Sequence, residues 1–465
     1  MRVLDTTTFE LKSGEQELFK QDGYAILSHR WVGMEITFDQ LPNHIAELKQ
    51  AAEKQRMSPQ LGKIRGACDL ARGQGIRWMW IDTCCINKSS TVEETESINS
   101  MFKWYRDAKV CITYLFDVDS SSTLGPPTYN AAVQSKKTEH ASQSSQSVFQ
   151  RVGSDRPSEW FSRGWTLQEL LAPRVMQFYD RHWQYIGTKS DLAPELERIT
   201  GIEVAYLTGA KHFRKACIAT KLSWQAGRTT AREEDIAYSM LGIFNIIMTP
   251  QYGEGSRAFM RLQHALLTTT TDESLFAWRM PSPTSGAKYD IEADHDANWG
   301  ADEWGLLAPT PDWFAGCGRV VIDGGRKIER PGKGFQATRQ GLQISFPPIS
   351  GYGKYKAMLF ASGLLFCLAI PIWIWIAKKI KREVAEHGMP FPLNCWRQSE
   401  AGTLAAVQIH MQPLVLRSFT QEGDVTRYKR IRCSELSSTT EYATKVLGSN
   451  TNEGFVVQPE LSYDS

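Results

Sequence analysis

A carboxylate among aromatic and aliphatic residues is the chemical feature that stands out in this 465-residue sequence. Glu169 follows Trp165 by four positions in the segment SRGWTLQELL, residues 162–171, and Arg163 precedes that tryptophan by two. Burial against aromatic side chains at the edge of a cleft raises the pKa of a carboxyl group and can tune it for chemistry. The alternative is an amphipathic helix start with both charged residues in water, where most charged residues lie.

Polar residues also follow the short apolar runs of the first half of the chain. Four buried strands are predicted, at residues 24–27, 78–81, 110–115 and 175–179. The polar residues at their ends are Ser28, Asp82, Asp117 and Asp180. Helical patterns separate these runs, which predicts an α/β fold with a parallel sheet flanked by helices. Because the carboxyl ends of parallel strands meet at one edge, we expect Ser28 and Asp82 to lie in the same crevice as Glu169. Turn formation alone is the alternative for each polar residue.

The chain is too long for one ordinary core, so several domains are expected. The sequence predicts an α/β domain over residues 1–185, with a disordered Ser-, Gln- and Lys-rich insertion at about 119–158. A mostly helical region follows over 186–285. The remainder, 286–465, is rich in Gly, Pro and Trp and has short strand-like runs, which predicts a small β-rich module.

An uncharged apolar block, AMLFASGLLFCLAIPIWIWIA at residues 357–377, interrupts the β-rich module. As a helix of roughly 31 Å it is long enough to span a bilayer, and lysines flank it on both sides. We therefore expect a single membrane anchor and a cytoplasmic N-terminal domain, although the heavier basic flank after the block disfavours that orientation. The alternatives are a buried helix of the C-terminal module and a gene-model artefact between two β-rich pieces.

Several function classes are disfavoured by composition and motifs. A net charge of +2 without a dense basic stripe gives no reason to expect nucleic-acid binding. The nine cysteines lack the spacing of a zinc site, and P-loop, G-x-S-x-G and H-E-x-x-H motifs do not occur. Cys84 and Cys85 would need a base such as His29 to act as nucleophiles, and inert packing is the alternative.

Four segments in order carry a family resemblance: YAILSHRW, WMWIDTCCINKSS, WFSRGWTLQELLAP and REEDIAYSMLGIF. Over roughly residues 22–172 they resemble the heterokaryon incompatibility (HET) domain of filamentous fungi. The resemblance implies a role in non-self recognition after hyphal fusion, ending in growth arrest or programmed cell death. It also implies partners, either a second copy of the chain or another incompatibility protein. One departure is the segment SHRWVG, where many members have glycine directly after the tryptophan.

The HET domain is in turn similar to Toll/interleukin-1 receptor (TIR) domains, many of which cleave NAD with a glutamate in a Trp-Cys-x-x-Glu motif. Residues 165–169 match that spacing with Thr in the Cys position, so the resemblance implies that Glu169 is catalytic and that NAD is the substrate, with no bound cofactor. The residues assigned to substrate binding are Ser28, Arg30, Trp31, Asp82, Arg163 and Trp165. The alternative is a non-enzymatic signalling module that self-associates and recruits partners, with the tryptophans in the core and Arg163 paired to Glu169.

Overall fold

The computed structural model describes residues 1–13, 22–50, 57–122, 147–282, 291–292, 301–323, 335–338, 341–345, 389–413, 426–431, 433, 437–439, 453–456 and 460–461. The chain forms two compact units. The first comprises Met1–Lys215 with Arg228–Pro250, and the second comprises Ala216–Gly227 with Gln251–Ser465.

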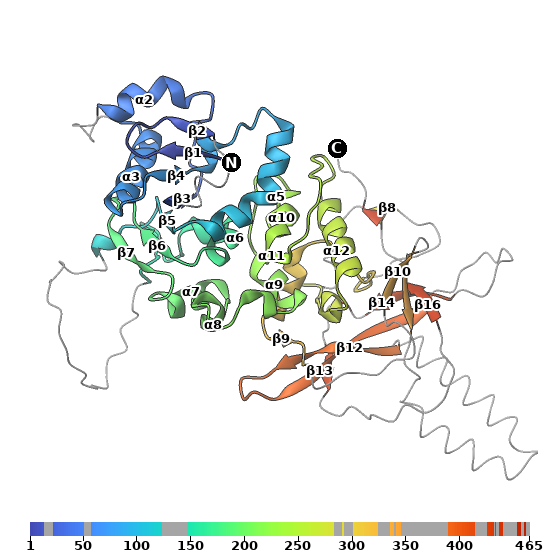
Figure 1. Cartoon of the computed structure of the whole chain (residues 1–465). Helices are drawn as coiled ribbons and strands as arrows, with labels where there is room; N and C mark the ends of the chain where they lie inside the picture. The colour runs from blue at the N-terminus through green and yellow to red at the C-terminus, as the bar shows by residue number, and fades with distance from the viewer. Residues whose placement is uncertain are drawn as a thin grey trace, which may run out of the picture. The chain divides into compact units, whose positions relative to one another are not determined.

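A seven-stranded sheet is the centre of the first unit, and its strands follow in the order β2-β1-β4-β3-β5-β6-β7 (Figure 1). The strands are β1 (Arg2–Asp5), β2 (Leu11–Ser13), β3 (Tyr24–His29), β4 (Trp78–Trp80), β5 (Val110–Tyr114), β6 (Met176–Tyr179) and β7 (Tyr185–Thr188). The four central strands β4, β3, β5 and β6 are parallel. The outer strands β1, β2 and β7 pair antiparallel. Every residue of β3 and β4 is buried, as expected for the centre of a parallel sheet covered on both faces.

The first unit has helices between its parallel strands and after its last strand. They are α2 (Leu41–Lys49), α3 (Pro59–Gly73), α4 (Asp82–Cys85), α5 (Thr91–Asp107), the 3-10 helix η3 (Glu159–Ser162), α6 (Trp165–Leu171), α7 (Ala193–Thr200), α8 (Val204–Leu207), α10 (Asp235–Tyr238) and α11 (Leu241–Phe244). The N-cap of α5 is Ser90, whose hydroxyl accepts from the backbone N–H of Glu93 at 3.4 Å.

A glycine allows α11 to approach α5 closely. A Cβ atom placed on Gly242 would lie 2.0 Å from the Cβ of Phe102, far inside van der Waals contact. In Figure 1 α5, α6 and α11 lie side by side, and the three helices contact one another. The glycine in the segment AYSMLGIF is therefore required by packing.

The second unit combines short helices with an antiparallel sheet. Its helices are α9 (Ile218–Gln225), α12 (Arg257–Thr269), η5 (Glu273–Phe276) and η7 (Pro311–Cys317). Its main sheet follows the order β10-β11-β16-β14-β13-β12-β9, with β15 paired to β13. These strands are β9 (Val320–Val321), β10 (Phe335–Thr338), β11 (Gly341–Ser345), β12 (Met389–Gln398), β13 (Leu404–Pro413), β14 (Thr426–Ile431), β15 (Ser437–Thr439) and β16 (Glu453–Val456). A separate pair joins β8 (Ile291–Glu292) to β17 (Glu460–Leu461).

The predicted fold class is confirmed: a mostly parallel α/β sheet with flanking helices, then a helical region and a small β-rich part. The boundaries of the predicted insertion differ from the structure. Residues 147–158 are folded, with Phe149 fully buried and Arg151 bridged to Val118. Residues 123–146 lie outside the described part of the chain.

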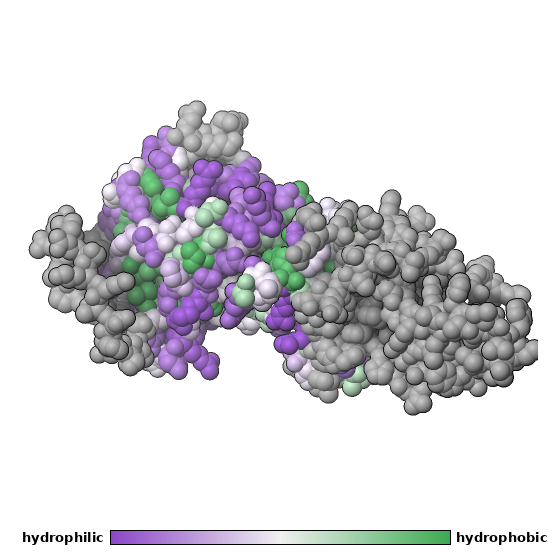
Figure 2. Space-filling view, turned by 90° about the horizontal axis from the view of Figure 1, so that it is seen from below, coloured by the Kyte–Doolittle hydropathy of each residue, from purple (hydrophilic) through white to green (hydrophobic). Residues whose placement is uncertain are grey.

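The prediction of a transmembrane helix is contradicted for the part of the chain that the structure describes. In the described part of the chain, no helix is long and apolar enough to cross a membrane. The longest described helix, α5, has 17 residues, of which Glu93, Lys103 and Arg106 are three of several charged ones. Residues 357–377 themselves lie outside the described residues. On the face drawn in Figure 2, hydrophilic residues cover most of the coloured surface and hydrophobic residues form small separate groups.

Candidate functional site

The order of the parallel strands creates a switch point at β3. The chain passes from β3 to β4 on one side and then crosses to β5 on the other side, which gives the order β4-β3-β5-β6. Open α/β sheets bind ligands outside the carboxyl ends of the strands at such a point. Ser28, near the end of β3, is paired with Thr113 of β5 at this position.

Glu169 lies directly at the switch point. The Ser28 hydroxyl donates to Glu169 Oε2 at 2.5 Å, although 141 residues separate the two in sequence. The indole N–H of Trp160 donates to the Ser28 hydroxyl oxygen at 2.9 Å, so a chain of two hydrogen bonds ends on the carboxyl group. Only 7% of Glu169 is exposed, and every residue of α6 after Trp165 is buried. Glu169 is therefore not on a solvated helix face.

Burial raises the pKa of Glu169 to about 8. The hydrogen bond from Ser28 acts in the opposite direction, the nearby charge of Asp82 raises the pKa further, and Tyr105 and Arg163 lower it. Tyr105, on α5, also donates its hydroxyl to the carbonyl oxygen of Leu27 at 3.0 Å. The acid is thus held largely protonated at neutral pH and ionises slightly above it.

Asp82 follows β4, the neighbour of β3, and lies beside the last residue of β3 and a residue of the loop after it. The indole N–H of Trp31 donates to Asp82 Oδ2 at 2.7 Å, and His29 Nε2 lies 3.8 Å from Asp82 Oδ1. Trp31 is 42% exposed, and the Lys88 ammonium lies 3.4 Å from its ring centroid. The expected convergence of Ser28, Asp82 and Glu169 at one sheet edge is what the structure shows.

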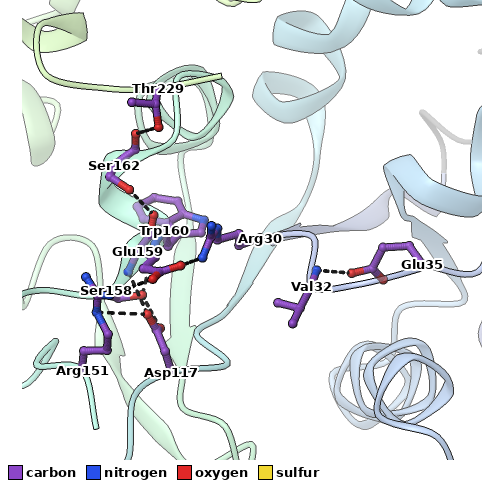
Figure 3. A network of polar contacts seen from close by, with 10 residues as sticks. All are labelled: Arg30, Val32, Glu35, Asp117, Arg151, Ser158, Glu159, Trp160, Ser162 and Thr229. Carbon is purple, nitrogen blue, oxygen red and sulfur yellow. Dashed lines mark hydrogen bonds and ion pairs between the residues drawn. The ribbon is translucent and has the colours of Figure 1, made fainter. Parts of the chain in front are cut away.

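The loop after β3 turns at a glycine. Gly33 has φ +69°, a conformation that side chains disfavour, and the backbone N–H of Val32 is held by Glu35 Oε1 at 2.8 Å (Figure 3). The glycine one position later than in many HET domains therefore still provides the turn that carries Trp31.

Arg30 is already engaged by an acid. Its guanidinium forms an ion pair with Glu159, which Arg151 also contacts at 2.7 Å (Figure 3). Burial lowers the pKa of Arg30, and the charge of Arg163 lowers it further. In this state Arg30 fixes the position of η3, and pairing with a pyrophosphate would require it to exchange partners.

Two aspartates at strand ends organise loops. Asp117 accepts from the Ser158 hydroxyl at 2.6 Å and from the Glu159 N–H at 2.8 Å (Figure 3). Asp180 accepts from the N–H and the hydroxyl of Ser120 at 2.9 and 2.7 Å and from two N–H groups of its own turn. Turn formation accounts for both.

The start of α6 is fixed by a later part of the chain. The Gly164 N–H donates to the Thr229 carbonyl at 2.9 Å, and the Thr229 N–H donates to the Ser162 carbonyl at 2.7 Å (the latter pair of residues appears in Figure 3). Arg228 donates to the Arg163 carbonyl at 3.0 Å. Burial lowers the pKa of Arg228 to about 10, and the charge of Glu169 raises it.

The remaining predicted residues have less defined positions. Arg163 is half-buried, and in the described part of the chain no ion pair within 4 Å joins it to Glu169, although its charge lowers the pKa of that acid. Trp165 is half-buried at the first position of α6. Cys84 is fully buried, and its hydrogen bond with Cys85 together with burial raises its pKa, which favours inert packing over a nucleophile.

Sequence reasoning missed Tyr105, Trp160 and Arg228 as neighbours of the acid. Tyr105 belongs to the apolar stripe of α5, so the sequence pattern predicts only a packing role and no polar contact for its hydroxyl. Arg228 lies 59 positions beyond Glu169. The segment WFSRGW contained a usable signal, because a buried indole N–H normally needs a partner.

The fold and site define a doubly wound α/β domain with a buried acid at its switch point. The family described as heterokaryon incompatibility protein (HET) matches residues 24–169, so this part of the chain is similar to a HET domain. A second family, a domain of unknown function (DUF8212), matches residues 257–350.

A curated relative is similar over the same region and beyond it. The vegetative incompatibility protein HET-E-1 of Podospora anserina is 36% identical over 246 residues. The match covers 52% of this chain and 16% of that protein. No solved structure matches.

Proposed function

We propose that this protein is an effector of heterokaryon incompatibility that acts in growth arrest or cell death, and that its HET domain cleaves NAD at the nicotinamide–ribose bond. The printed name of the Podospora relative and the HET match support the incompatibility role. The observation that carries the enzymatic part is the burial of Glu169 at the switch point, with Ser28 fixing its orientation.

The proposed chemistry needs one carboxylate. Nicotinamide leaves with the electron pair of the glycosidic bond, positive charge develops on the ribose, and water then adds to the sugar with loss of a proton. The Glu169 carboxylate stabilises the developing charge, as in glycoside hydrolysis. Because the positively charged nicotinamide ring favours the ionised carboxyl group, binding of NAD lowers the pKa of Glu169 from about 8.

Nicotinamide release from NAD tests the proposal. The purified full chain is assayed at pH 8 beside Glu169→Gln and a control, Glu96→Gln, which removes an exposed carboxylate of α5. We expect Glu169→Gln to lower kcat by at least about 100-fold, the loss typical for one electrostatic stabiliser, and the control to match the wild type. If neither the wild type nor a forcibly oligomerised form releases nicotinamide, the enzymatic proposal is wrong.

The second candidate is a non-enzymatic module that self-associates or recruits another incompatibility protein. The raised pKa of Glu169 favours it, because a protonated acid bonded to Ser28 is also what a purely structural buried glutamate requires. Complementation of the arrest phenotype by Glu169→Gln would decide for this candidate.

A further inference from the structure

A buried histidine beside the acid has no hydrogen-bond partner. Both ring nitrogens of His29 lack a partner among the described residues, and so does Oδ1 of Asp82. The His29 side chain is 1% exposed. Buried polar groups in folded proteins are nearly always paired, so an unpaired set of this kind at a ligand-binding edge indicates that something else completes it.

The two residues cannot satisfy each other. Their closest atoms, His29 Nε2 and Asp82 Oδ1, are 3.8 Å apart, beyond hydrogen-bond distance. Asp82 is held in place through its other oxygen by Trp31, at 2.7 Å. The position of Oδ1 is therefore fixed, and it lies beside the imidazole without a hydrogen-bond partner among the described residues.

Burial and two nearby positive charges keep the His29 imidazole neutral. Burial lowers its pKa well below the ordinary value, and the nearby charges of Lys63 and Lys88 lower it further. Lys63 itself is bonded to Glu35 at 2.5 Å. A neutral imidazole has one N–H donor, so the pair His29 and Asp82 offers one donor and one carboxyl acceptor side by side.

This pair adjoins the catalytic acid without overlapping it. Ser28 and His29 are consecutive in β3, so their side chains leave opposite faces of the sheet, and only Ser28 reaches Glu169. Asp82 lies close enough to both that it contacts His29 and raises the pKa of Glu169. A ligand at the strand end can therefore meet both groups.

We propose that His29 and Asp82 form the subsite for a primary carboxamide, that of the nicotinamide ring of the substrate. The amide carbonyl accepts from the His29 N–H, and the amide N–H donates to Asp82 Oδ1. A primary carboxamide carries a carbonyl acceptor and an N–H donor on the same carbon, so it can complete both unpaired groups at once. This inference rests on the proposed function for the identity of the ring.

Binding of the free base tests the subsite without requiring turnover. Calorimetry with the full chain compares nicotinamide, pyridine, which lacks the amide, and nicotinate, which lacks its N–H donor. We expect nicotinamide to bind at least about tenfold more tightly than either, because each analogue leaves a buried charged or polar group unpaired. Asp82→Asn keeps the side-chain shape but replaces an acceptor with a donor, so the ratio of nicotinamide to nicotinate affinity should fall at least about tenfold.

The outcomes separate the subsite from the proposed activity. If Asp82→Asn reverses the preference for nicotinamide over nicotinate, the subsite is supported whether or not NAD is cleaved. If NAD is cleaved and the preference is unchanged in Asp82→Asn, the subsite is wrong and the activity stands. If nicotinamide binds no better than pyridine, the subsite is overturned. His29→Leu provides a second variant, in which the preference for nicotinamide over pyridine should fall, and Glu96→Gln is the unchanged control.

Discussion

Replacing Glu169 by glutamine should stabilise the protein, and increasingly so as pH rises. The pKa of Glu169 is about 8 in the folded chain against an ordinary 4.5. Between these values the folded state keeps a proton that the unfolded state releases, so the stability of the wild type falls as pH rises through this window. Glutamine retains the shape and an acceptor for Ser28 but does not ionise.

The magnitude follows from the gap between the two pKa values. Complete ionisation corresponds to about 5 kcal/mol, and about 3 kcal/mol of this is already lost at pH 7. Urea unfolding of wild type and Glu169→Gln is measured from pH 5 to pH 9. We expect the variant to gain about 4 kcal/mol relative to the wild type over that range.

Glu96→Gln is the matched control, because it removes one carboxylate from an exposed position of α5. Its stability relative to the wild type should change little with pH. A difference between Glu169→Gln and wild type that is flat from pH 5 to pH 9 would refute the raised pKa, and with it the argument that burial tunes this acid.

Two further substitutions test how the site is supported. Gly242→Ala places a methyl group against Phe102 and should destabilise by about 1–3 kcal/mol or more in urea unfolding, and an unchanged midpoint would show that α11 can shift away. Lys189→Met removes the ammonium that donates to the carbonyls of Leu170 at 3.0 Å and Pro173 at 2.6 Å at the end of α6. We expect a loss of about 1–3 kcal/mol, whereas full stability in thermal and urea unfolding would mean that water replaces the lysine.

The central strands were predictable because each is a short apolar run with a polar residue at its carboxyl end. The missed strands lack this pattern. β1, RVLD, has four residues with charges at both ends, and β7, YIGT, is partly exposed. Such strands form because they can hydrogen-bond to the edge of a neighbouring strand. The local sequence does not show that this neighbour is present.

The approach of Ser28, Asp82 and Glu169 was predictable from topology, since parallel strands present their ends together. The groups that surround Glu169 were not predictable from the sequence. Trp160 and Tyr105 contribute one polar atom each to groups that look purely apolar in sequence, and whether Arg30 is free or paired with Glu159 depends on packing after folding.

The return of the chain at residues 228–229 has a consequence for inheritance. The HET family match ends at residue 169, yet the backbone that fixes the start of α6 includes Thr229, and the buried Arg228 interacts electrostatically with Glu169. A recombination event that exchanges the segment 24–169 between alleles would transfer the acid and leave behind the residues that hold it. We therefore expect alleles of this protein to exchange functional variants only as longer blocks that reach past residue 229. Chimaeras joined near residue 169 should combine Glu169 from one parent with Arg228 and Thr229 from the other.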